Sequence, residues 1–216
     1  MTIFAGIDDI PIMRGQVTIP AYGIWHADIW LDREVALTGQ VTLTLADISA
    51  VATIVRVIGF LGQTGLRIVG GYGGWRKPVA AMQFAAPFGL ALKTVLVRTA
   101  ADVGEFVEVG GDSVGTAYVR SSGPAARVLQ SLIPARWYVG FDGVTQASAR
   151  PAGVVADRFS VIDVSQPAGA YVVASNAPGE WLPGRTFNGP SISGVVSRVQ
   201  HQIENATLRT VVLDGG

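Results

Sequence analysis

Alternating apolar and polar residues dominate the first third of the chain. Over residues 41–45, for example, valine and leucine alternate with threonine. Because successive side chains of a strand point to opposite faces, such alternation is typical of a strand that is buried on one side. The pattern predicts five strands, at residues 15–19, 24–31, 38–45, 50–58 and 66–69. Short strands separated by glycine-containing turns are typical of an antiparallel sandwich or barrel.

The middle of the chain changes to helical spacing. Residues 90–103 place apolar side chains three and four positions apart, and Gly104 provides a stop at the C-terminal end. Residues 123–133 predict a second short helix, with Pro124 in its first turn and Pro134 directly after its end.

A hairpin and a second β region complete the chain. Residues 137–141 predict a strand that runs into an Asp142–Gly143 turn, and Glu204–Asn205 joins two later strands through a tight turn. The four clearest strands of the C-terminal third are at residues 159–164, 170–174, 194–203 and 206–213.

These elements predict a mainly β protein of the α+β class. We expect two small antiparallel β-barrel or sandwich domains, with a small mixed segment carrying two short helices between them. The expected boundaries are 1–86 for the N-terminal β domain, 87–149 for the mixed segment with its hairpin, and 150–216 for the C-terminal β domain.

The composition narrows the function. Apolar residues make up 49% of the 216 and charged residues 15%, which excludes a disordered chain. Sixteen basic and sixteen acidic side chains cancel, so no basic excess is present to bind nucleic acid. Without cysteine and with only His26 and His201, the chain is expected to hold no metal and no cofactor. The apolar stretches 48–61 and 79–92 are shorter than the ~20 residues of a membrane helix.

One short segment matches a catalytic motif. Gly111-Asp-Ser113-Val-Gly115 fits G-x-S-x-G, and Asp142 or Asp163 with His201 would complete a triad. A nucleophile elbow needs a helix after its serine, whereas residues 116–119 look extended, and His201 falls inside a predicted strand. A plain β-turn is therefore favoured and no catalytic residue is predicted. A serine esterase that uses Ser113 and His201 stays open as an alternative.

The tryptophans offer a second alternative. Exposed aromatic side chains such as Trp25, Trp75 or Trp181 would suit a β-sandwich carbohydrate-binding module. Trp25 and Trp30 fall on opposite faces of one predicted strand, so they do not form a single aromatic platform. Trp75 follows the glycine cluster of residues 70–74, which is interpreted as a structural turn with an aromatic anchor.

Two longer segments resemble those of a known family. Residues 123–143, a short helix that leads into an aromatic strand and an Asp-Gly turn, are similar to a segment of the baseplate hub proteins of tailed bacteriophages. The closing hairpin of residues 194–213 also resembles the terminal hairpin of such proteins. The resemblance implies a trimer in which two related β domains per chain alternate around a central channel.

A structural role follows from this resemblance. We expect a non-enzymatic virion protein, a subunit of the baseplate or tail hub that joins the tail tube to the central spike or fibre and lines a channel. Its expected partners are further copies of itself, a tail tube or distal tail protein, and a spike or central fibre protein. The expected location is the phage tail, after synthesis in the cytoplasm of the bacterial host. The low charge density suits such an obligate assembly.

Overall fold

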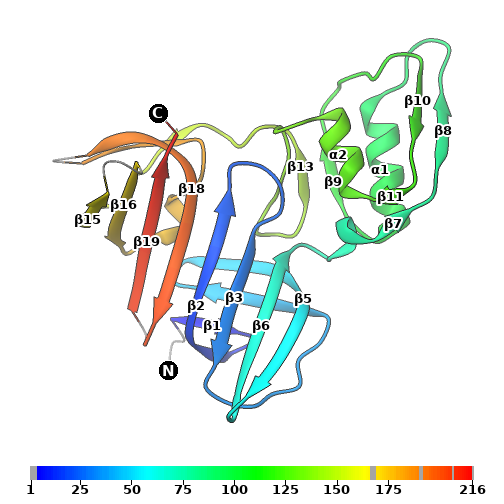
Figure 1. The fold of residues 1–216 in the computed structure, drawn as a ribbon. Coiled ribbons are helices and arrows are strands. Elements are labelled where there is room, and N and C mark those ends of the chain that lie inside the picture. Colours follow the sequence, from blue (N-terminus) through cyan, green and yellow to red (C-terminus); the bar gives the residue numbers. More distant parts are fainter. Residues whose placement is uncertain (1–3, 166–168, 190–191, 206, 216) are drawn as a thin grey trace.

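Three regions follow one another along the chain. The computed structural model describes residues 4–165, 169–189, 192–205 and 207–215. Figure 1 shows a β-barrel at the centre, a lobe that carries both α-helices on one side, and a C-terminal β domain on the other. The predicted fold class, mainly β with barrel or sandwich domains and two short helices, is confirmed.

Six antiparallel strands close the N-terminal barrel. Their order around it is β1-β4-β5-β6-β3-β2, and β2 returns to β1 through the pair Gly6 and Pro11. The strands are β1 (Ala5–Ile7), β2 (Ile10–Pro20), β3 (His26–Leu31), β4 (Gln40–Leu45), β5 (Ile48–Phe60) and β6 (Gln63–Gly70). The five strands predicted in this region are all present.

The interior of the barrel is filled by the apolar positions of the alternating pattern. Val41, Leu43 and Leu45 are buried, as the alternation predicts. Trp25 is fully buried against Gly70, where an added Cβ would lie 2.3 Å from the indole nitrogen. The strand can pass this close to the ring only because glycine has no side chain.

The lobe is built from two helices and three small sheets. Helix α1 (Leu92–Val103) ends at Gly104, which has the left-handed φ of 76° expected of a C-terminal cap. The ribbon β8–β10, the pair β7–β11 and the sheet β12-β13-β9 surround the helices. The elements are η1 (Gly74–Arg76), β7 (Pro78–Val79), β8 (Met82–Ala85), β9 (Val107–Val109), β10 (Ala117–Arg120), β11 (Gly123–Pro124), α2 (Ala126–Leu132), β12 (Tyr138–Val139) and β13 (Thr145–Ala147).

The second helix begins later than predicted. Gly123 and Pro124 form strand β11 and pair with Val79 and Pro78, so α2 starts at Ala126. The expectation that Pro124 lies in the first helical turn is therefore wrong. Pro124 is compatible with the first turn of a helix and with a short strand. Pairing with β7, which is distant in the sequence, places it in the strand.

The C-terminal domain curves around an aromatic cluster. The Trp181 ring lies 4.9 Å from Phe159 and 5.7 Å from Phe187, measured between ring centroids. All four strands predicted in this region are present among those of the domain; residue 206, where the last of them was predicted to begin, lies outside the described residues. The elements are β14 (Gly153–Val154), β15 (Phe159–Ser165), β16 (Ala170–Ser175), η3 (Pro178–Glu180), β17 (Arg185–Asn188), β18 (Ser193–Glu204) and β19 (Thr207–Asp214).

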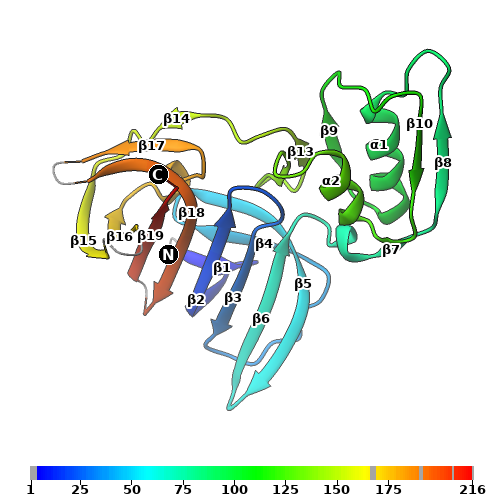
Figure 2. The same cartoon turned by 45° about the horizontal axis from the view of Figure 1, so that its top comes forward.

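One continuous sheet joins the barrel to the C-terminal domain. Strand β18 pairs with β2 over seven residues, from Arg14 to Pro20, and the sheet then continues through β19 and β16 to β15 (Figure 2). A second contact ties the two regions, because the Gly179 amide donates a hydrogen bond to the Asp47 carboxylate at 3.0 Å. The two β regions are thus held together by backbone hydrogen bonds between the two ends of the chain.

Candidate interaction surfaces

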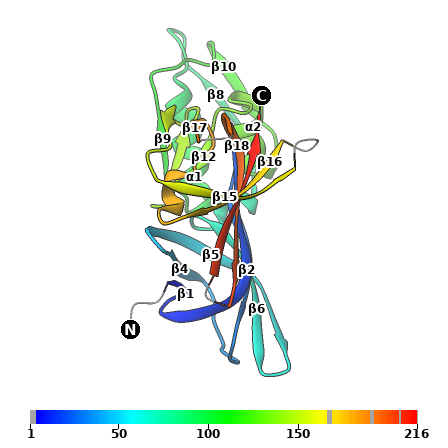
Figure 3. The ribbon, with the colours of Figure 1, turned by 90° about the vertical axis from the view of Figure 1, so that its left-hand side faces the viewer.

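The hairpin of β5 and β6 projects from the barrel with apolar side chains in water. Figure 3 shows it extending at the bottom, beyond the other barrel strands. Val57 and Ile58 are exposed, and at the tip Phe60 and Leu61 are 61% and 85% exposed. Several exposed large apolar side chains on one hairpin are typical of a surface that contacts another protein. We call Val57, Ile58, Phe60 and Leu61 the hairpin tip.

Free strand edges lie near both ends of the long sheet. Strand β4 pairs with β5 as far as Thr53, and the Ile54 amide still donates to the Gly39 carbonyl at 2.9 Å. Within the described part of the chain, the outer edge of residues 55–60 therefore has no strand partner. At the other end, β15 pairs with β16 alone among the described strands. Unpaired N–H and C=O groups on such edges can pair with strands of another subunit.

The lobe presents a second apolar surface. Phe88 and Val119 are fully or largely exposed near the β8–β10 ribbon. Below α1, a groove of about 530 Å³ is lined by apolar side chains that include Val97 and Phe106, and the Phe106 ring packs edge-on against Tyr72 at 5.1 Å. Val97 and Phe106 belong to the groove between α1 and the segment that leads into β9.

A buried arginine fixes the ribbon to helix α1. The guanidinium of Arg120 donates hydrogen bonds to the Ala80 carbonyl at 3.1 Å and to Thr99 Oγ1 at 3.0 Å. It also forms an ion pair of 2.8 Å with Asp102. A second, exposed arginine, Arg98, contacts the same carboxylate from the preceding turn of the helix. Buried charges are tolerated when they are paired and hydrogen-bonded in this way.

A buried glutamate holds the glycine cluster. The Glu105 carboxylate accepts hydrogen bonds from the backbone N–H groups of Gly74 at 2.5 Å and of Tyr72 and Trp75 at 3.4 Å. Burial raises the pKa of Glu105, and the three donors oppose that shift. The Trp75 indole is buried and donates to Thr145 Oγ1 at 2.7 Å. The cluster is the aromatic-anchored structural turn that the sequence indicates.

Ser113 and His201 lie in different regions of the molecule. Ser113 is part of the lobe, where its hydroxyl donates to the Leu90 carbonyl at 3.3 Å and accepts from the Gly115 amide at 3.4 Å. His201 lies on β18, fully buried, with Nδ1 3.0 Å from Thr210 Oγ1. The structure does not bring the two side chains together, and Ser113 is followed by strand β10 rather than by a helix.

The two candidate aspartates do not complete a triad either. Asp142 lies in the turn after β12, where its carboxylate accepts from the Val144 amide at 2.9 Å. Asp163 is exposed on β15 and accepts from the Val164 amide at 2.8 Å. Both carboxylates cap local backbone, and His201 takes Thr210 as its partner instead.

The expectation of exposed tryptophans is wrong. Trp25, Trp75 and Trp181 are at most 1% exposed, and each belongs to a different one of the three regions. Their large apolar area contributes more to stability inside a core than on a surface, and this decided their placement. They cannot form the sugar-binding face of a carbohydrate module.

The second histidine and the acidic side chains are the remaining candidate ligands. His26 is half-buried on β3, and burial, together with the nearby Arg67, lowers its pKa. No group of three or more histidine and acidic side chains is close enough to hold a metal ion in the described ranges. None of the helices described is long and apolar enough to cross a membrane. No sequence motif marks Arg120 or Glu105, so sequence reasoning missed both.

This chain is similar to known proteins in structure and not in sequence. No protein-family model and no curated protein matches the sequence. The Escherichia coli c3393 protein, a component of the type VI secretion system described as structurally similar to the T4 bacteriophage tail proteins gp27 and gp5, aligns with a TM-score of 0.65. That alignment has 9% identity and covers 98% of this chain and 75% of the other.

A second solved structure supports the same conclusion. The 43 kDa tail protein of prophage MuSo2 from Shewanella oneidensis aligns with a TM-score of 0.63 and 8% identity, over 93% of this chain and 91% of the other. The resemblance to tailed-bacteriophage tail proteins inferred from the sequence is confirmed at the level of the fold: this chain has the fold of phage tail and phage-tail-like proteins.

Proposed function

We propose that this chain is a structural, non-enzymatic subunit of a phage tail or phage-tail-like particle. The observation that carries the proposal is the fold, which this chain shares over nearly its whole length with a prophage tail protein and with a type VI secretion component. The likeness spans both β regions and the lobe between them, so it concerns a complete architecture rather than a common barrel.

Within that role, we propose the position of a hub. Three copies would form a ring in which the barrel and the C-terminal β domain of each chain alternate around a central channel. The ring would contact a tail tube or distal tail protein on one face and a spike or central fibre protein on the other. The protein would then reside in the tail after synthesis in the host cytoplasm.

The apolar hairpin tip and the free strand edges support self-assembly. A ring needs an interface between two different surfaces of the same chain. Residues 55–60 of β5 and the outer edge of β15 provide two such surfaces, near different ends of one sheet. The hairpin tip adds apolar area that would be removed from water when copies associate.

A double substitution at the hairpin tip tests the assembly. We expect Phe60→Asp with Leu61→Asp to weaken self-association at least about 100-fold, because each buried large apolar side chain contributes about 1.5–3 kcal/mol. Sedimentation velocity over a range of concentrations measures the effect, and circular dichroism checks that the fold is retained. Tyr22→Asp, at an exposed aromatic side chain in the segment between β2 and β3, is the matched control and should associate like the wild type. Unchanged association of the double variant would contradict the role assigned to the tip.

A further inference from the structure

Arg150 is a partly buried cation that pairs with no carboxylate of the described residues. It lies in the segment between the lobe and the C-terminal domain, and its guanidinium carbon is 4.1 Å from the centroid of the Tyr138 ring. Nε and Nη2 are buried, and neither has a hydrogen-bond partner among the residues that the structure describes. The third nitrogen, Nη1, does not belong to this buried and unpaired set. The stacking on Tyr138 fixes the plane of the group and leaves its charge unneutralised.

Arg120, the buried arginine of the lobe, shows how unusual the unpaired guanidinium of Arg150 is. Arg120 satisfies three of its nitrogens with a carbonyl, a hydroxyl and a carboxylate. Burial lowers the pKa of Arg150 to about 10, and no carboxylate within the described residues offsets that cost. A buried guanidinium that is kept in this state is expected to meet its partner from outside the chain.

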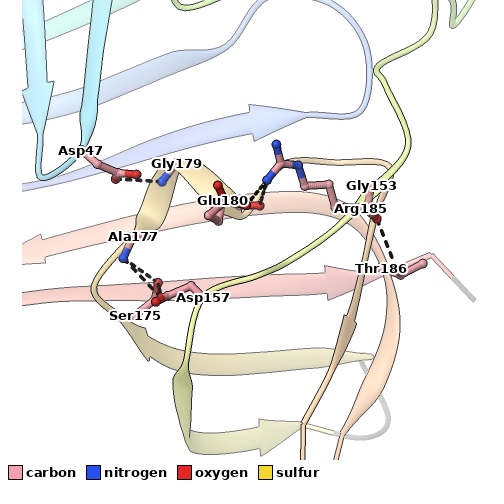
Figure 4. Close-up of polar contacts among 9 residues, drawn as sticks. All are labelled: Asp47, Gly153, Asp157, Ser175, Ala177, Gly179, Glu180, Arg185 and Thr186. Carbon is pink, nitrogen blue, oxygen red and sulfur yellow. Dashed lines mark hydrogen bonds and ion pairs between the residues drawn. The ribbon is translucent and has the colours of Figure 1, made fainter.

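A pocket opens beside Arg150. It has a volume of about 340 Å³, and its charged side chains are Arg150, Glu180 and Arg185. Figure 4 shows that Glu180 and Arg185 are paired with each other, so these two charges cancel. The positive charge of Arg150 is the one in the pocket that remains uncompensated.

The rest of the pocket favours an extended peptide over a small hydrated anion. Its wall contains aliphatic and proline side chains, including Pro151, Leu182 and Pro183. The rim is formed by strand β14, which pairs with β17 on one side and, in the described part of the chain, has no strand on the other. In Figure 4, Thr186 donates to the Gly153 carbonyl and holds this short strand in place.

We propose that this pocket binds the carboxylate of an acidic side chain that a neighbouring protein subunit inserts, with Arg150 as its recognition residue. The carboxylate would accept a charge-assisted hydrogen bond from Nη1 and neutralise the whole delocalised guanidinium. Its aliphatic stem would lie against Pro151 and Leu182. The identity of the neighbouring protein as a tail subunit rests on the proposed function. The recognition of a carboxylate by Arg150 does not depend on it.

Titration with a capped side chain tests the pocket in the free, full-length protein. The probes are N-acetyl-glutamic acid α-amide, its neutral analogue N-acetyl-glutamine α-amide, and inorganic phosphate. The readout is the Nε–Hε NMR signal of Arg150, assigned by its absence in Arg150→Met. We expect a saturable shift with the glutamic acid probe at about 10–100 mM, the range expected for one charge-assisted hydrogen bond, and no shift with the glutamine probe.

Variants separate recognition from stability. Arg150→Met keeps the aliphatic stem and removes the charge, and we expect its melting temperature to rise by about 2–4 °C and to be insensitive to the glutamic acid probe. Arg33→Met, at an exposed arginine, is the matched control and should keep the wild-type response. No saturable shift, an equal shift with the glutamine probe, or tighter binding of phosphate would each overturn the proposal. Because none of these readouts requires assembly, a monomeric protein that binds the probe would refute the ring and leave the pocket intact.

Discussion

Arg120→Met is expected to lower the free energy of unfolding by about 3–5 kcal/mol. The side chain is 1% exposed, and its loss leaves the Ala80 carbonyl without its donor and removes the buried ion pair with Asp102. Methionine fills most of the volume, so the loss reports the polar network rather than a large cavity. Urea denaturation, monitored by tryptophan fluorescence, measures the change in the free energy of unfolding.

Arg98→Met is the matched control for this prediction. Arg98 contacts the same Asp102 carboxylate at 3.0 Å, but its side chain is largely in water. Exposed ion pairs contribute about 0–1 kcal/mol, so the Arg98 variant should remain close to the wild type. If the two variants lost equal free energy of unfolding, the burial of Arg120 would not determine its contribution. That result would contradict the role of Arg120 in fixing the ribbon to α1.

Acidification is expected to destabilise the protein through His201. Burial lowers the pKa of this histidine from 6.5 to about 3 in the folded state. The unfolded chain therefore takes up the proton first, and folding stability, complete above pH 6.5, is lost as the pH falls towards 3. The loss attributable to His201 should reach about 2 kcal/mol at pH 5 and grow by about 1.4 kcal/mol per further pH unit.

The difference between the wild type and His201→Gln isolates this effect. Glutamine can still hydrogen-bond Thr210 but carries no titrating group. Glu105 contributes equally to both proteins, so its contribution cancels when their free energies of unfolding are subtracted at each pH. Its pKa is raised in the folded state, so protonation of Glu105 stabilises the fold as the pH falls, opposite to the effect of His201. His26→Gln, at the half-buried second histidine, should keep most of the wild-type slope. A parallel pH dependence for wild type and His201→Gln would contradict the assignment.

The strands were predictable because their pattern is local. Alternation over residues 41–45 marks one buried face, and the structure buries Val41, Leu43 and Leu45. Helix α1 was predictable for the same reason, since apolar spacing and Gly104 both lie within one segment. Each of these signals depends on neighbours a few residues away.

Contacts between distant segments could not be predicted in this way. Nothing in the pattern of residues 14–20 indicates that β2 pairs with β18, nearly two hundred positions later. The start of α2 was misplaced because β7 takes Pro124 into a strand pair. The division into an N-terminal β domain (1–86), a mixed segment (87–149) and a C-terminal β domain (150–216) remains a prediction.

The same limit applies to the candidate sites. Trp25, Trp75 and Trp181 were equally compatible with a surface or a core until their neighbours were placed. Arg150 carries no sequence motif, and it became a candidate only when the structure showed its guanidinium buried and unpaired. Whether a charged side chain has a partner depends on contacts between segments that are distant in the sequence. A single sequence does not show these contacts.

The mass of the purified full chain in solution tests the central claim most directly. Light scattering over a range of concentrations, with negative-stain images of the same sample, should show particles of three times the 22.6 kDa chain mass. The images should show rings with a central hole. A mass of 22.6 kDa at every concentration, with no rings, would contradict the proposal that the chain assembles as a tail hub.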